Sequence, residues 1–252
     1  MIRLQPHPCP PELTPEEAGR MTTEYQADTT KSVWNKDFIK TALLKMSHGK
    51  CCYCECKIDE ESKYLEVEHF QPKSLYPLLV VFWENLLPSC KRCNGIKWNH
   101  DTVAEPIIHP VRDEPKDHIR FRAYRFYEKT PLGKKTIEVV DLNDRVRLKL
   151  MEKRFEIGEG IISELDVLED MALDFQNNVN TSPKRQKLIV GKMKTILTEA
   201  QPEKEYAATA ATVLIHEPLF TEVKNILLAC HLWDDEMAGM ENAARHIAFD
   251  IF

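Results

Sequence analysis

The sequence lacks several features that mark common functional classes. Residues 1–11 contain no apolar stretch of the kind that a secretory signal needs, so we expect no export signal. The longest apolar run, residues 78–83, is far too short to span a bilayer. There is no glycine-rich phosphate loop, which excludes an ATPase of the P-loop class, and no internal repeat. These absences favour a cytoplasmic protein with no membrane contact.

An overall positive charge is also missing. The formal net charge is -6, whereas a protein that binds nucleic acid without specificity is usually basic. The charge is uneven, however: residues 112–154 contain 13 basic and 8 acidic side chains, and residues 155–252 contain 8 basic and 17 acidic ones. Phosphate would be attracted by the first segment and repelled by the second, so we expect a local basic patch or a partner protein.

The sequence does contain cysteines in a metal-binding pattern. Four of its eight cysteines form two C-x2-C pairs, Cys51/Cys54 and Cys90/Cys93. Two such pairs can close a tetrahedral zinc site, and in a reducing cytoplasm this pattern predicts structural Zn2+ rather than disulfides. Either Cys52 or Cys56 could take the place of a member of the first pair.

Three polar sequences lie between or directly after these pairs. They are Glu68-His69, at the end of a segment that alternates like a strand, then Asn85, then Asn94 directly after the second pair. This order resembles the HNH endonuclease family in its four-cysteine zinc form. In that family an Asp-His ends a first strand, an Asn lies in the following turn, and a second cysteine pair opens a helix that carries His or Asn.

The resemblance implies an α+β fold built around a zinc-stapled ββα-metal core, also called the HNH or His-Me finger. It implies that His69 is the general base and that Glu68 and Asn94 hold a catalytic Mg2+ or Mn2+ ion. Asn85 would fix the turn that holds the histidine ring. Two departures bear on metal choice, because the family usually has Asp where Glu68 stands, and Asn94 replaces a His.

Several basic residues are candidates for contact with nucleic acid. Lys97 lies one helical turn beyond Asn94 and could touch phosphate; the others are Lys91, Arg92, Arg120 and Arg122. Arg120 and Arg122 belong to a stretch that alternates basic and aromatic residues, which is also typical of a solvated sheet face.

We expect three parts: an arm and a helix over 1–49, the HNH core with an extension over 50–143, and a helical region over 144–252. Within them the patterns predict a helix over 32–48 capped by Ser32, a strand over 64–70 and a buried apolar segment over 75–83. A strand pair with a turn at 131–133 should follow. Helices are predicted over 144–176, 183–199, 203–215, 219–229 and about 234–249.

Further segments resemble the nuclease subunits of Septu-type anti-phage systems: the C-P-P-E-L sequence at residues 9–13, His109-Pro110 and Leu142-Asn143. That resemblance implies a partner, an ABC/SMC-like, PtuA-like ATPase, and phage DNA as substrate. Related proteins accompany retrons, where the target is RNA such as tRNA. Two other hypotheses remain, a non-catalytic zinc adaptor and a free-standing nuclease.

Overall fold

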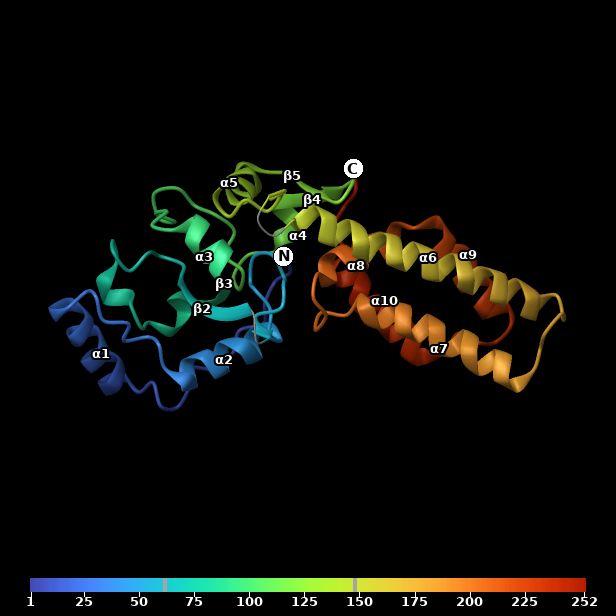
Figure 1. Ribbon diagram of the computed structural model, residues 1–252, viewed down its shortest axis with the longest axis horizontal. Helices are drawn as coiled ribbons and strands as arrows, with labels where there is room; N and C mark the ends of the chain where they lie inside the picture. Colours follow the sequence, from blue (N-terminus) through green and yellow to red (C-terminus); the bar gives the residue numbers. More distant parts are fainter. Residues whose placement is uncertain (61–62, 147–148) are drawn as a thin grey trace. The chain divides into compact units, whose positions relative to one another are not determined.

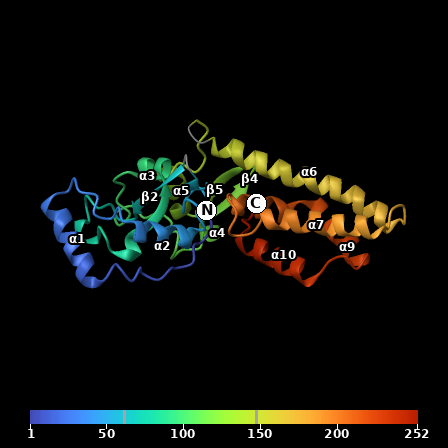
Figure 2. The ribbon, with the colours of Figure 1, turned by 60° about the horizontal axis from the view of Figure 1, so that its bottom comes forward.

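The structure is a computed structural model that describes residues 1–60, 63–146 and 149–252. The described chain is α+β, mostly helical, with small sheets. It divides into two compact units (Figures 1 and 2): the first comprises residues 1–119 and 126–144, and the second comprises residues 120–125 and 145–252. Among the helices that the structure describes, none combines the length and apolar composition that a bilayer crossing requires.

A three-stranded antiparallel sheet forms the centre of the first unit. Its strands are β1 (Asp59–Glu60), β2 (Lys63–His69) and β3 (Leu86–Cys90), in the order β1-β2-β3. The register pairs Leu65 with Cys90 and His69 with Leu86. Every residue of β3 is buried. The short helix α3 (Lys91–Lys97) follows β3 directly, because Cys90 is both the last strand residue and the N-cap of the helix.

Two N-terminal helices belong to the same unit (Figure 1). Helix α1 (Pro15–Ala27) begins at Thr14, whose hydroxyl accepts a hydrogen bond from the Glu17 amide. Helix α2 (Asp37–Ser47) packs on β3 and ends at two residues with left-handed backbone, His48 and Gly49.

The predicted cap at Ser32 is wrong, because residues 32–35 form a turn and Lys36 is the N-cap. Trp34 therefore lies before α2, where its ring packs edge-on against Tyr25 and His69.

The sequence predicts a buried apolar segment over residues 75–83, but the loop between β2 and β3 is only partly buried. It contains two short 3-10 turns, η1 (Pro77–Leu79) and η2 (Trp83–Asn85). Val80 and Val81 are buried, whereas Leu75, Leu78 and Phe82 are each at least half exposed. Turns rotate successive side chains in different directions, so an apolar run in such a loop cannot place all its members on one buried face.

The next segment contains α4 (Pro115–His118), β4 (Ile119–Arg122), β5 (Arg125–Glu128) and α5 (Pro131–Val139). The predicted turn at 131–133 is wrong, since the chain reverses at Ala123 and Tyr124, both with positive φ. Pro131 instead opens α5, where the Thr130 hydroxyl accepts a hydrogen bond from the Gly133 amide. A Cβ on Gly133 would lie 1.9 Å from the backbone oxygen of His118, so only glycine fits there.

The described residues from 149 to 252 form five helices (Figure 1): α6 (Leu150–Gln176), α7 (Pro183–Glu199), α8 (Ala207–His216), α9 (Pro218–Ala229) and α10 (Asp235–Ile247). The predicted helices match these closely except at the starts of α6 and α8, which begin six and four residues later than predicted; residues 147–148 of the first prediction lie outside the described residues. Helix α8 contacts each of the other four helices, and residues 207–212 are all buried. Its alanines and threonines allow the neighbouring helices to approach closely.

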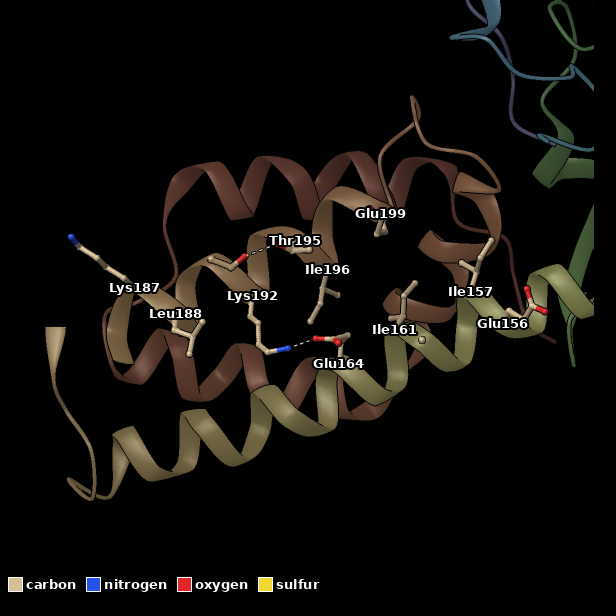
Figure 3. A pocket seen from close by; sticks show the side chains of 12 residues that line it. Glu156, Ile157, Ile161, Glu164, Lys187, Leu188, Lys192, Thr195, Ile196 and Glu199 are labelled. Carbon is tan, nitrogen blue, oxygen red and sulfur yellow. Dashed lines mark hydrogen bonds and ion pairs between the residues drawn. The ribbon is translucent and has the colours of Figure 1, made fainter. Parts of the chain in front are cut away.

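A groove of about 700 Å³ lies between α6 and α7 (Figure 3). Ile157, Ile161 and Ile196 line it, and the Lys192 ammonium group pairs with the Glu164 carboxylate across the two helices. No residue that the sequence marks as a candidate site residue lines this groove.

Candidate metal centre and active site

Four cysteine thiols converge in the first unit, those of Cys51, Cys54, Cys90 and Cys93. Their sulfur atoms all lie within 4.8 Å of one another, and all four side chains are buried. A tetrahedral Zn2+ with Zn–S bonds of about 2.3 Å would separate its sulfur ligands by about 3.8 Å. The Cys54 and Cys90 sulfur atoms are 3.8 Å apart. The donor set therefore fits a structural zinc.

Local backbone geometry positions both cysteine pairs. In the first pair, a turn joins the Cys51 carbonyl to the Glu55 amide, and Glu55 has a left-handed φ of 65°. In the second, the Cys90 sulfur accepts a hydrogen bond from the Cys93 amide in the first turn of α3. The remaining two cysteines of this region, Cys52 and Cys56, are also buried, and they lie outside the four-sulfur cluster.

The Glu68 carboxylate forms a buried ion pair with Lys97. The Lys97 Nζ lies 2.6 Å from Glu68 Oε1, and the two side chains are 0% and 2% exposed. The same ammonium group donates to the backbone oxygen of His69 at 3.0 Å, and the Tyr53 hydroxyl lies 3.5 Å from Glu68 Oε1. Burial raises the pKa of Glu68 to about 7, against the opposing effect of the Lys97 charge.

This buried ion pair departs from the expectation that Lys97 touches phosphate. Its ammonium group is enclosed and engaged by two partners, Glu68 and the His69 carbonyl, so it has no path to an external phosphate in this structure. Lys97 instead joins α3 to the end of β2. It thereby compensates the negative charge of a carboxylate that water does not solvate.

The His69 ring is fixed in one orientation. Its Nε2 lies 2.9 Å from the Val80 backbone oxygen, and since a carbonyl only accepts, Nε2 carries the hydrogen and Nδ1 carries the lone pair. The Trp34 ring packs edge-on against it, with ring centroids 4.8 Å apart. Burial, together with the nearby positive charge of Lys73, lowers the pKa of His69 to about 3. The imidazole is therefore neutral at physiological pH.

Asn85 fastens the loop that orients this histidine. Its Oδ1 accepts from the Gln71 amide at 2.7 Å, and its Nδ2 donates to the backbone oxygens of Gln71 and Leu79 at 3.0 and 3.2 Å. Leu79 directly precedes Val80, whose carbonyl holds the His69 ring. Asn85 thus acts on the site through the backbone rather than by direct contact with His69.

Asn94 lies one turn before Lys97 on α3. Residues three apart on a helix are neighbours on one face, so Asn94 lies on the same side of α3 as the lysine that binds Glu68. Its side chain is half-buried, and within the described chain its amide makes no hydrogen bond. An amide oxygen without a protein partner is available to a divalent cation.

The two basic residues that open α3 differ in their environment. Lys91 is exposed. The Arg92 guanidinium is turned inward: it donates to the backbone oxygens of Val140 and Asp141 at 2.8 and 2.6 Å, and its side chain is 6% exposed. It also lies 3.7 Å from the Cys93 sulfur. Arg92 therefore connects α3 to residues 140–141. This inward arrangement does not favour the contact with nucleic acid that the sequence suggests for Arg92.

Arg120 and Arg122 lie on β4, where their exposed side chains alternate with the buried Ile119 and Phe121. They follow the expected pattern of a half-buried strand. Both arginines belong to the residue ranges of the second unit, whereas the cysteine cluster and Glu68 belong to the first.

Two residues that contact the site, Trp34 and Tyr53, are not among the candidates that the sequence motifs indicate. A fully buried tyrosine inside a zinc knuckle must find a partner for its hydroxyl, and that requirement was the available signal.

Comparison with known proteins identifies two relatives. The chain is 45% identical over 248 residues to the Septu protein PtuB of Bacillus thuringiensis, covering 98% of this chain and 95% of the relative. It is 29% identical over 192 residues to the Septu protein PtuB of Bacillus mycoides (strain KBAB4), covering 62% of this chain and 63% of that relative. No family model and no solved structure matches the chain.

Proposed function

The chain belongs to the Septu PtuB family, and from that membership we propose that it is the nuclease subunit of an anti-phage defence complex. It would be a metal-dependent HNH endonuclease that hydrolyses phosphodiester bonds. The order β2–β3–α3, closed by the four-cysteine cluster and carrying Glu68-His69 at the end of β2, supports a ββα-metal core.

His69 would act as the general base. A neutral imidazole with its hydrogen held on Nε2 by the Val80 carbonyl offers the Nδ1 lone pair to the proton of an attacking water. The fixed ring needs no reorientation at the moment of proton transfer. This orientation of His69 beside a buried acidic residue is the observation that carries the proposal.

Glu68 and Asn94 would hold a catalytic Mg2+ or Mn2+, since a carboxylate and an amide oxygen are the hard donors that such ions prefer. The bound ion would neutralise phosphate charge and stabilise the leaving oxygen. Within the described chain, Glu68 Oε2 has no hydrogen-bond partner, whereas Oε1 faces Lys97. Lys97 favours the ionised carboxylate that a cation requires, against the cost of burial.

The partner would be an ABC/SMC-like ATPase of the PtuA type. The family name supports this assignment. The sequence contains no phosphate loop of its own, so nucleotide hydrolysis would come from another subunit. The acidic second half of the chain would repel nucleic acid, which supports a protein contact there and a substrate site in the first unit. Phage DNA is the proposed substrate, with RNA such as tRNA as the alternative.

The test is cleavage by the chain purified together with a PtuA-type ATPase, with Mg2+ and either duplex phage DNA or tRNA. His69→Ala should abolish cutting of the true substrate, and His246→Ala, which changes an exposed histidine on α10, should cut like wild type. Equal cutting by wild type and His69→Ala would refute the nuclease assignment. Nucleic-acid or ATPase binding without any cleavage would favour the zinc adaptor.

A further inference from the structure

We propose that Lys73 is the residue of this site that contacts the substrate phosphate, held in place by the face of Trp34. This inference rests on the proposed nuclease function and names a positioning group for it. The question arises because Lys97, the lysine that the sequence favours for this role, is enclosed and bound to Glu68.

Lys73 lies in the turn that follows β2. The Pro72 carbonyl accepts hydrogen bonds from the amides of Leu75 and Tyr76, at 3.0 and 2.9 Å, and these bonds close the turn around Lys73. The turn begins three residues after His69, so Lys73 is carried by the same segment as the proposed general base. Its backbone is therefore fixed relative to the imidazole.

The Lys73 ammonium group lies over the Trp34 ring, 4.8 Å from the ring centroid. A cation–π contact of this kind holds an ammonium group without neutralising its charge. Trp34 in turn packs edge-on against His69 and against Tyr25, so the ring that carries the ammonium is itself braced on two sides. The aromatic cluster places a positive charge beside the imidazole.

The positive charge of Lys73 affects the pKa values of both His69 and Glu68. It lowers the pKa of His69 and opposes the rise in the pKa of Glu68 that burial causes. Within the described residues, Lys73 Nζ makes no hydrogen bond and no ion pair, and its side chain is only half-buried. Burial lowers the pKa of Lys73, and the charges of Glu68 and Glu66 oppose that shift, so the ammonium group is a partly exposed positive charge close to the proposed reacting groups.

These properties match the needs of a phosphodiester. Its non-bridging oxygens carry the negative charge, and a charge-assisted hydrogen bond from an ammonium group to one of them both positions the phosphate and lowers its repulsion of the attacking water. Lys97 forms a direct ion pair with Glu68, whereas Lys73 forms no ion pair within the described residues. The two lysines of the site thus have separate tasks.

The test compares Lys73→Met with a matched control, Lys45→Met, which removes an exposed lysine from α2 in the same unit. Loss of one charge-assisted phosphate contact should lower kcat/KM for cleavage about tenfold to hundredfold in Lys73→Met. Lys45→Met should cut like wild type. Zinc content and thermal unfolding should be unchanged in both variants, which separates a phosphate contact from a structural role.

A second measurement does not depend on cleavage. In the His69→Ala background, binding of duplex DNA and of tRNA is measured against salt concentration. Adding Lys73→Met should weaken binding to the true substrate and reduce the slope of log K against log salt by about one, the effect of one lost phosphate contact. Lys73→Arg should retain the slope. Trp34→Ala should weaken binding more than Trp34→Phe, because phenylalanine keeps an aromatic face for the ammonium group.

The outcomes distinguish the two proposals. If wild type does not cleave but Lys73→Met still reduces the salt slope, the nuclease assignment fails and the phosphate contact stands. If wild type cleaves and the Lys73→Met and Lys45→Met variants match in both rate and slope, Lys73 is not the phosphate contact. Absence of any nucleic-acid binding by wild type would overturn both.

Discussion

Replacing Lys97 by Met should strongly destabilise the first unit. The substitution keeps most of the side-chain volume but removes the ammonium group that lies 2.6 Å from Glu68 Oε1 and 3.0 Å from the His69 carbonyl oxygen. A buried carboxylate and a buried carbonyl then lose their partner. Removing one member of a fully buried ion pair typically costs about 3–5 kcal/mol, because the remaining charge stays buried without compensation.

Protonation of Glu68 limits the loss of stability in the Lys97→Met variant. The pKa of Glu68 is already raised to about 7, and removing the Lys97 charge raises it further, so the variant can neutralise the carboxylate below that pKa. A raised carboxylate pKa means that stability is highest at low pH and falls as the pH rises through the folded pKa. The deficit of Lys97→Met relative to wild type should therefore be larger at pH 8 than at pH 6.

Denaturant unfolding at both pH values, followed by tryptophan fluorescence without added magnesium, measures the effect. Most of the signal comes from the first unit, which contains three of the four tryptophans, Trp34, Trp83 and Trp98. The double variant Lys97→Met/Glu68→Gln should recover much of the loss, because both charges are then absent. A free energy of unfolding within about 1 kcal/mol of wild type at pH 8 would refute the ion-pair reasoning.

Three further predictions concern other parts of the chain. Cys93→Ser should lower the zinc content below one ion per chain, measured by mass spectrometry, and unfold the first unit, since structural zinc contributes about 10–16 kcal/mol of folding free energy in small domains. Gly133→Ala should destabilise the chain by about 1–3 kcal/mol in thermal unfolding, because the new Cβ would meet the His118 backbone oxygen. The control Gly160→Ala, in helix α6 with open space around the added Cβ, should be neutral or stabilising. Glu241→Gln should lower the free energy of unfolding of the second unit by about 1–3 kcal/mol, because it removes charge-assisted hydrogen bonds from Lys224 and Arg245. The pKa of the Glu241 carboxyl is lowered, so this difference from wild type should shrink as the solution is acidified.

Local signals in the sequence were enough to place many elements. Helix α7 runs from Pro183 to Glu199 as predicted, because Ser182 caps it and a proline at its first position cannot continue a preceding element. Gly49 ends α2 for an equally local reason, its left-handed backbone. The cysteine spacing likewise favoured the four thiols that converge, with Cys52 and Cys56 as alternatives, since a C-x2-C pair presents both sulfurs on one side of a tight turn.

The errors share a different cause. Ser32 has the chemistry of a cap, yet α2 begins five residues later, where the chain can turn Trp34 against His69 and Tyr25. The apolar run at 75–83 was expected to be buried, but turns around Pro77 direct Leu78 and Phe82 outward. Contacts with distant segments decided the first case, and the backbone turns of the loop decided the second.

The sequence by itself indicated the two cysteine pairs that converge, the order of strands and helices around them, and the helical character of the second half. Only the tertiary structure decided what the basic residues do. A lysine or arginine on a short helix is usually exposed, and nothing local to α3 shows that Lys97 meets Glu68 or that Arg92 meets residues 140–141. Ion pairs of this kind depend on how closely two segments far apart in the chain approach, and burial then determines whether a charge binds its own protein or remains available to a substrate.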